Sequence, residues 1–198
     1  MNKALIYDFE TLSQNPEKAA VISLAVMVFD LDIAERKGYD YETLLDTTRY
    51  MKFDVVEQIK KFDREIEMKT LQWWQEQGIE AAKELKPSNF DVSITEMQPL
   101  IKSLMTQHEI KYVFTRNNTF DPVIFHSICR KTDAIIPYPW WVIRDTKSFI
   151  MGLTYGHNIK DDFIPTEAEG LYVKHDPRHD IVLDVMRIQT ILSAKFGE

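Results

Sequence analysis

The sequence lacks the features that mark secreted and membrane proteins. It has a single cysteine, Cys129, which excludes an intramolecular disulfide and indicates a packing role in a helical stretch. No uninterrupted apolar run is long enough to span a bilayer, and the N-terminus has no basic segment followed by an apolar core. We therefore expect a cytoplasmic protein that has no membrane partner.

Positive charge is also scarce. The 198 residues carry 24 lysines and arginines against 31 aspartates and glutamates, which gives a formal net charge of -7. This balance argues against a broad basic face for duplex nucleic acid. It leaves room for a narrow site, because bound metal ions cancel the charge of nearby carboxylates, and an enzyme that grips a few terminal nucleotides needs few phosphate contacts.

The composition is that of an ordinary globular domain, with 44% apolar and 28% charged residues, and the length suits one domain at residues 1–198. Three predicted strands follow one another as in a meander, while the later strands alternate with helices. This order predicts an α/β fold, with a mixed five-stranded sheet flanked by helices. The predicted strands lie at 3–12, 21–29, 50–53, 112–115 and 142–143. The predicted helices are a short one that starts at 54–57 and longer or later ones at 65–78, 79–85, 93–105, 123–129, 145–151 and up to about 194.

The first predicted strand ends in two carboxylates, Asp8 and Glu10. The side chains of a strand alternate between its faces, so these two point the same way, roughly 6 to 7 Å apart along the chain. Two anions held this close favour a cation between them, and their oxygen atoms suit a hard divalent ion such as Mg²⁺ or Mn²⁺. The alternative at this point is a strand end whose acids are solvated.

Two further carboxylates lie in later elements of the predicted fold. Asp121 lies just after the fourth strand, and Asp184 lies within the last helix. Because sites in such sheets form where loops from different strands meet, we expect these acids to join Asp8 and Glu10. Four carboxylates from three segments match the needs of two cations ~3.5 to 4 Å apart, the arrangement used for in-line phosphoryl displacement.

A histidine near the last acid is suited to act as a general base. His179 titrates near neutral pH, and it precedes Asp184 by five residues, about 140° on an ideal helix. Both side chains reach one site only if His179 precedes the regular helix, and Pro177 favours that arrangement. The alternatives are a surface histidine, and Asp180 as a competing ligand one turn before Asp184. His175 is expected to cap or pack the loop.

Trp73 and Trp74, in the predicted helix at 65–78, have two interpretations. Aromatic side chains most often fill cores, but exposed aromatic faces also stack on unpaired bases. The sequence leaves both interpretations open for this pair.

Three motifs, taken in order, resemble those of a known enzyme family. They are Asp8-Phe-Glu10-Thr11, Asn117-Asn-Thr-Phe-Asp121, and His179 with Asp184 in an H-x-x-x-x-D frame. Over nearly its whole length the chain resembles the DEDD 3'→5' exonucleases of the histidine-bearing (DEDDh) branch, and it is similar to the ribonuclease T-like phage and bacterial enzymes within that branch. The resemblance implies a ribonuclease H-like fold, and a location in the cytoplasm of a bacterium or of a phage-infected host cell.

The resemblance also implies an activity. Such an enzyme removes nucleoside 5'-monophosphates from the 3' end of a single-stranded nucleic acid, using two Mg²⁺ or Mn²⁺ ions. Similarity to phage enzymes favours DNA, with RNA as the alternative; a non-catalytic nucleic-acid-binding domain and an acidic metal-binding protein are weaker interpretations. By this resemblance the metal ligands are Asp8, Glu10, Asp121 and Asp184, the base is His179, and the substrate contacts are Thr11, Phe120 and Leu12, the last wedged against the terminal base.

Overall fold

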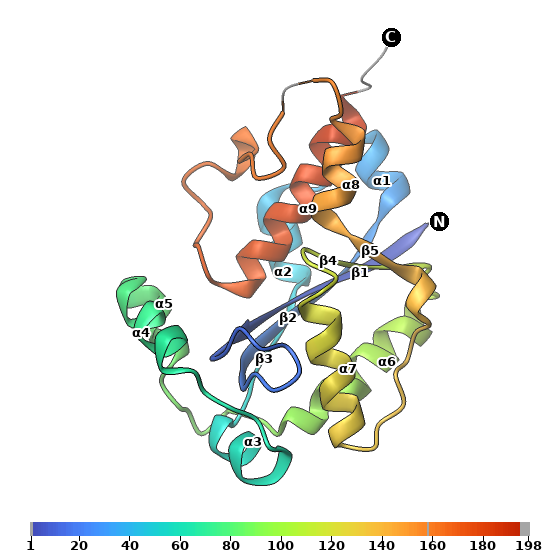
Figure 1. The fold of residues 1–198 in the computed structure, drawn as a ribbon. Coiled ribbons are helices and arrows are strands. Elements are labelled where there is room, and N and C mark those ends of the chain that lie inside the picture. Colours follow the sequence, from blue (N-terminus) through green and yellow to red (C-terminus); the bar gives the residue numbers. More distant parts are fainter. Residues whose placement is uncertain (1, 158, 195–198) are drawn as a thin grey trace.

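A mixed five-stranded sheet forms the centre of the protein (Figure 1). The computed structural model describes residues 2–157 and 159–194. The strands are β1 (Lys3–Thr11), β2 (Val21–Asp30), β3 (Arg49–Lys52), β4 (Tyr112–Thr115) and β5 (Ile143–Asp145). Their order is β3-β2-β1-β4-β5, with antiparallel pairing from β1 through β2 to β3 and parallel pairing from β1 through β4 to β5. The predicted α/β fold class is therefore confirmed.

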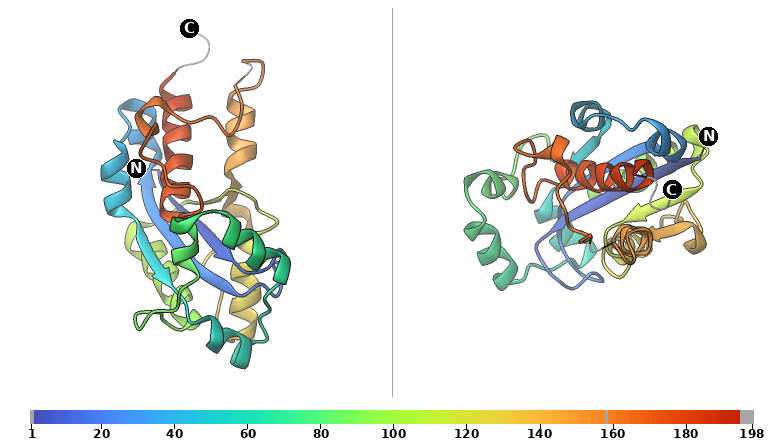
Figure 2. Two further views of the ribbon diagram at one scale, coloured as in Figure 1. Left: turned by 90° about the vertical axis from the view of Figure 1, so that its left-hand side faces the viewer. Right: turned by 90° about the horizontal axis from the view of Figure 1, so that it is seen from above.

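Helices cover both faces of this sheet (Figures 1 and 2). Two of them, α1 (Leu31–Arg36) and α2 (Tyr41–Thr47), are missing from the sequence prediction. Among the described helices, none combines the length and the apolarity that a bilayer span requires. Besides α1 and α2, the described helices are α3 (Val55–Phe62), α4 (Met68–Glu76), α5 (Ile79–Glu84), α6 (Met97–His108), α7 (Asp121–Lys131), α8 (Thr146–Leu153) and α9 (Pro177–Ser193). Three short 3-10 helices are η1 (Ile94–Glu96), η2 (Trp140–Val142) and η3 (Thr166–Ala168).

Alternation along β1 decides which layer each of its side chains joins. Ala4 and Ile6 lie on one face, in a core shared with α2, α8 and α9. Leu5, Tyr7 and Phe9 lie on the other face, in a core shared with α6 and α7. Both faces of β1 are apolar over this stretch, as expected for a central strand that has helices on both sides.

The last helix, α9, lies on one face of the sheet and contacts α1, α2 and α8 (Figure 2). It begins at Pro177, whose fixed φ suits the first helical position. Proline lacks a backbone N–H, but an N–H at this position would have no partner within the helix, so nothing is lost. Asp176 caps this start, since its side chain accepts a hydrogen bond from the backbone N–H of Arg178 (3.0 Å). The sequence from 177 onward is therefore helical from its first residue.

A third, smaller core closes the end of the sheet near α4. Leu12 is 5% exposed and packs with Ile22 of β2 and with Trp74 of α4. The indole N–H of Trp74 donates to the carbonyl oxygen of Thr11 (2.9 Å), which ties the end of β1 to this helix. In the structure the Leu12 side chain thus packs in an apolar core, and its contact with a terminal base stays a prediction.

Replacing Leu12 tests this core assignment. Leu12→Ala removes buried apolar volume, so we expect the free energy of unfolding to fall by about 2 to 5 kcal/mol. Urea denaturation followed by circular dichroism measures the change. Met68→Ala, at a nearby exposed position of α4, serves as the control and should leave stability nearly unchanged. Equal stability of the two variants would contradict the core role of Leu12.

Candidate active site

Three carboxylates meet where the end of β1 faces α9. Asp8 and Glu10 continue the face of β1 on which Ala4 and Ile6 pack, and α9 covers that face. Asp180, in the first turns of α9, completes the group, which we call the acid cluster. Asp8, Glu10 and Asp180 each offer one oxygen atom, and these atoms all lie within 4.8 Å of one another. Oxygen donors this close suit a hard divalent cation.

Burial and mutual repulsion raise the pKa values of the acid cluster. Burial raises the pKa of Asp8 well above its usual range, and the carboxylates of Asp121 and Glu10 raise it further. Burial also raises the pKa of Glu10, with added repulsion from Asp180 and Asp121. For Asp180, burial raises the pKa to about 6. A divalent cation would stabilise the ionised forms of all three, so this set of donors fits a metal site.

Asp121, the predicted acid after β4, lies beside the acid cluster. It is the first residue of α7, and its Oδ1 accepts a hydrogen bond from the backbone N–H of Phe9 (3.1 Å). The pairing of β1 with β4 ends at Ile6 and Phe114. The backbone N–H of Phe9 lies beyond these pairs, and the side chain of Asp121 serves as its hydrogen-bond acceptor. Burial raises the pKa of Asp121 to about 7. The structure therefore brings this predicted residue to the site.

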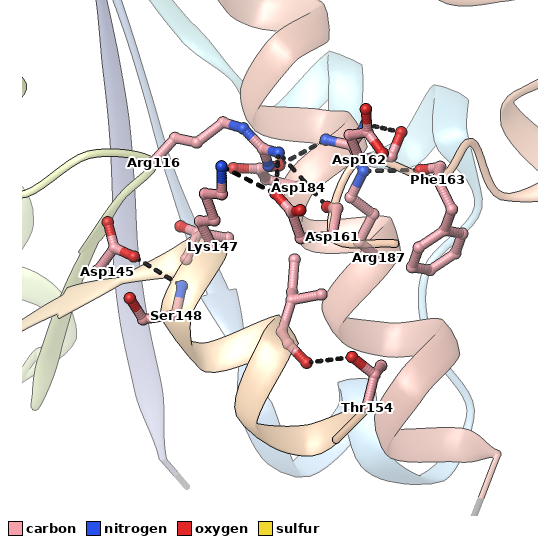
Figure 3. A network of polar contacts seen from close by, with 12 residues as sticks. Arg116, Asp145, Lys147, Ser148, Thr154, Asp161, Asp162, Phe163, Asp184 and Arg187 are labelled. Carbon is pink, nitrogen blue, oxygen red and sulfur yellow. Dashed lines mark hydrogen bonds and ion pairs between the residues drawn. The ribbon is translucent and has the colours of Figure 1, made fainter. Parts of the chain in front are cut away.

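Asp184, the predicted fourth ligand, lies one turn further along α9 and is paired with two arginines (Figure 3). Its Oδ1 accepts hydrogen bonds from Nη1 of Arg116 (2.6 Å) and from Nη1 of Arg187 (2.7 Å). Burial raises the pKa of Asp184, and the two guanidinium groups oppose that shift by stabilising the ionised form. Among the described residues, the set of oxygen atoms within 4.8 Å includes Asp180 and does not include Asp184.

His179 lies inside α9, at its third residue. His179 and Asp184 were expected to reach one site only if His179 preceded the regular helix. The helix starts at Pro177, so this condition is not met. Nδ1 of His179 is hydrogen-bonded to the hydroxyl group of Tyr41 (2.5 Å), and its Nε2 lies 4.0 Å from Oδ2 of Asp176. These contacts tie the ring to α2 and to the cap of α9.

His175, in contrast, precedes α9 and lies in a left-handed backbone conformation (φ 64°), which histidine adopts more readily than most residues. Its ring packs edge-on against Trp73 (4.7 Å between centroids) and near Trp74 (6.1 Å). Its Nε2 is buried and has no hydrogen-bond partner among the described residues, and burial lowers the pKa of the ring. The signal for this residue was in the sequence, since a second H-x-x-x-x-D frame runs from His175 to Asp180.

An open cavity of about 740 Å³ adjoins the acid cluster. Glu10 and Thr11 from β1, Phe120 from the residue before α7, and Trp73 from α4 contribute to its lining. Trp73 is 40% exposed whereas Trp74 is 1% exposed, so Trp74 is a core residue and Trp73 is available to a ligand. Two predicted substrate contacts, Thr11 and Phe120, thus share a cavity with a member of the acid cluster.

The raised pKa values predict that the metal-free protein loses stability as pH rises. Folded Asp121, with a pKa of about 7, and folded Asp180, with a pKa of about 6, hold protons that the unfolded chain has released. The free energy of unfolding should therefore fall between about pH 4 and pH 7. Thermal unfolding in a chelator measures this, and Mn²⁺ should raise Tm more at pH 8 than at pH 5.

Asp8→Asn supplies the matched control for that measurement. It removes one of the repelling charges, so the metal-free variant should be at least as stable as the wild type at pH 8 and should gain less from Mn²⁺. Stability of the metal-free wild type that rises from pH 4 to pH 7 would contradict the electrostatic description of this site.

Comparison with known proteins supports an assignment to a family. Residues 3–192 match the family described as "3'-5' exoribonuclease Rv2179c-like domain". The chain is also similar to the exodeoxyribonuclease of Enterobacteria phage T4, with 28% identity over 209 residues that cover 97% of this chain and 90% of the phage protein.

Solved structures of exonuclease I share the fold. The zinc-bound complex of Escherichia coli exonuclease I with single-stranded DNA superposes with a TM-score of 0.58 at 15% identity, over 98% of this chain and 40% of that chain. Exonuclease I from Methylocaldum szegediense gives a TM-score of 0.58 at 15% identity, over 100% of this chain and 41% of that chain. This chain therefore spans well under half the length of those exonucleases, and the likeness confirms the predicted ribonuclease H-like fold. With the family match over residues 3–192, the chain belongs to the family of 3'-5' exoribonuclease Rv2179c-like domains.

Proposed function

We propose that this protein is a metal-dependent exonuclease that shortens single-stranded nucleic acid from its 3' end. The observation that carries the proposal is the acid cluster of Asp8, Glu10 and Asp180, which adjoins an open cavity with an exposed aromatic side chain. Family membership supports the direction of cleavage. A domain that only bound nucleic acid would gain nothing from buried carboxylates facing a polyanion, so the cluster favours catalysis over binding alone.

Asp8, Glu10 and Asp180 would hold a divalent metal, with Asp121 placed to contribute to a second ion. A pair of such ions lowers the pKa of bound water and stabilises the leaving oxygen of a phosphodiester. The protein fixes its own donors firmly. Asp8 and Glu10 lie on the central strand, and the Tyr172 hydroxyl donates a hydrogen bond to Oδ1 of Asp180 (2.5 Å), which orients that carboxylate.

The proposed general base is His175. It precedes α9 by two residues and Asp180 by five, and its buried Nε2 has no hydrogen-bond partner within the described part of the chain, so no protein group occupies the position at which this nitrogen would accept a proton. Because burial lowers its pKa, the ring is neutral at neutral pH, which is the state that a base requires. His175 and Asp180 replace His179 and Asp184 as the proposed third motif.

The cavity beside Glu10 is the proposed site of the terminal nucleotide. The exposed ring of Trp73 offers a stacking surface for an unpaired base, and Phe120 adds a second aromatic side chain to the lining. The family description supports RNA as the substrate, whereas the phage exodeoxyribonuclease and the exonuclease I complex with single-stranded DNA support DNA. Whether the substrate is DNA or RNA therefore has to be decided by an assay that includes both nucleic acids.

The proposed function is tested with 5'-labelled DNA and RNA oligonucleotides of one sequence, incubated with Mg²⁺ or Mn²⁺. We expect a ladder that shortens from the 3' end, loss of cleavage in a chelator, and resistance of circular single strands. Asp180→Asn should reduce kcat by ~10²-fold or more, because it removes a ligand from the acid cluster. Rapid cleavage of circles would identify an endonuclease, and the absence of any cleavage would reject the nuclease function.

Replacing each of the two histidines in turn tests which of them is the general base. His175→Ala should lower kcat by ~10² to 10⁴-fold, whereas His179→Ala should have a much smaller effect. The wild-type rate should decline as the solution is acidified through the pKa of His175, which burial places below the ordinary value of about 6.5, and this acid limb should flatten in His175→Ala. A larger loss in His179→Ala would restore the frame that pairs His179 with Asp184.

A further inference from the structure

Asp184 lies at the centre of an ion-pair network that joins separate segments of the chain (Figure 3). Arg116 comes from the connection between β4 and α7, and Arg187 comes from the next turn of α9. Both arginines donate through Nη1 to the same oxygen atom of Asp184. The side chains of Asp184 and Arg187 are only 4% and 8% exposed, so each of these buried charges depends on the other for compensation.

The remaining N–H groups of the two arginines reach the connection between α8 and α9. A guanidinium group has donors in a fixed planar fork, so the ion pair to Asp184 also fixes where its other N–H groups point. The acceptors are Oδ2 of Asp161 (3.1 Å) for Arg116, and the carbonyl oxygens of Phe163 (2.7 Å) and Asp162 (3.1 Å) for Arg187. Figure 3 shows these contacts gathered over one side of α9.

The connection that is anchored in this way, residues 159–176, leads directly to the proposed site. Its Tyr172 makes the hydrogen bond that orients Asp180, and its His175 is the proposed base. Between the network and Tyr172, Ala168 of η3 is buried in the core under α9. The position of both functional side chains thus depends on a connection with little regular secondary structure, fastened at its start by the two arginines.

We propose that Asp184 is a positioning residue, which holds the two arginines against residues 161–163 and thereby fixes the approach of Tyr172 and His175 to the acid cluster. This role rests on the proposed nuclease function, and it differs from the ligand role that the sequence pattern predicts. Oδ1 of Asp184 already accepts hydrogen bonds from two guanidinium groups, so this oxygen atom is poorly placed to bind a cation as well, because the cation and the two guanidinium groups would repel one another.

Metal binding distinguishes the two roles without any measurement of activity. In titration calorimetry with Mn²⁺ on the full chain, Asp180→Asn should weaken binding ~10-fold or more because it removes a ligand, while Asp184→Asn, which acts on the site only through Tyr172, should weaken binding by a clearly smaller factor. Glu17→Gln is the matched control for loss of one negative charge, because Glu17 lies in an exposed ion pair with Arg130. Equal weakening by Asp180→Asn and Asp184→Asn would make Asp184 a ligand and overturn the proposal.

Hydrogen exchange and steady-state kinetics test positioning itself. In Asp184→Asn the backbone amides of residues 161–176 should exchange ~10-fold faster while those of β1 stay protected, and kcat should fall ~10 to 100-fold with KM within about threefold. A residue that only stabilised the fold would leave kcat unchanged at a temperature where the variant is folded. Asp184→Glu, which keeps the charge, should restore part of kcat.

Arg116→Gln provides a second variant in case Asp184→Asn does not fold, because the Arg116 side chain is 33% exposed and its removal leaves the buried pair of Asp184 and Arg187 intact. It should move exchange and kcat in the same direction, by smaller factors. Unchanged exchange and kcat in the variants would overturn the proposal. If the wild type cleaves no oligonucleotide, the proposed function fails, and exchange and metal binding still decide the role of Asp184.

Discussion

The repulsion between carboxylates that are buried together is the constraint on which this structure depends. Asp8, Glu10 and Asp180 lie with their oxygen atoms close together in a place where burial already disfavours charge. A fold tolerates such a group only if stronger interactions hold in place the strand and the helix that bear these side chains. Here those interactions are the pairing of β1 on both of its edges and the apolar packing of α9 against the sheet. The packing of the two apolar layers thus stabilises a fold that keeps three carboxyl groups together.

Two acids on the same helix show how their surroundings decide what a carboxylate can do. Asp180 and Asp184 are one turn apart and both are largely enclosed, yet Asp180 faces other carboxylates while Asp184 faces Arg116 and Arg187. The first has an unbalanced negative charge that favours a cation, and the second is already compensated within the protein. Spacing along α9 alone does not separate these cases, because one of the two partners of Asp184, Arg116, is 68 residues away in the sequence.

The sequence predicted the sheet, and it predicted where Asp8, Glu10 and Asp121 lie in the fold, since each position follows from a local pattern; their role as ligands stays a prediction. The apolar run before Asp8 and Glu10 marks a buried strand, and Asp121 follows the next strand that pairs with it. The third motif is harder to place from the sequence, because a proline at 177 is compatible both with a non-helical approach and with a helix start, and in the structure α9 begins at this residue. The burial of Leu12 was not predictable from its neighbours in the chain, because it depends on Trp74, which a different helix brings to the end of β1.

The position of α9 in the chain has a consequence for synthesis of the protein. Asp8 and Glu10 leave the ribosome before Asp121, and Asp121 leaves it before Asp180. A nascent chain that has emerged only as far as α8 therefore carries most of the proposed ligands but neither Asp180 nor the proposed base, His175. On this assignment the proposed site is complete only after α9 has emerged and packed against the sheet, so a chain whose synthesis has reached only α8 has no complete site.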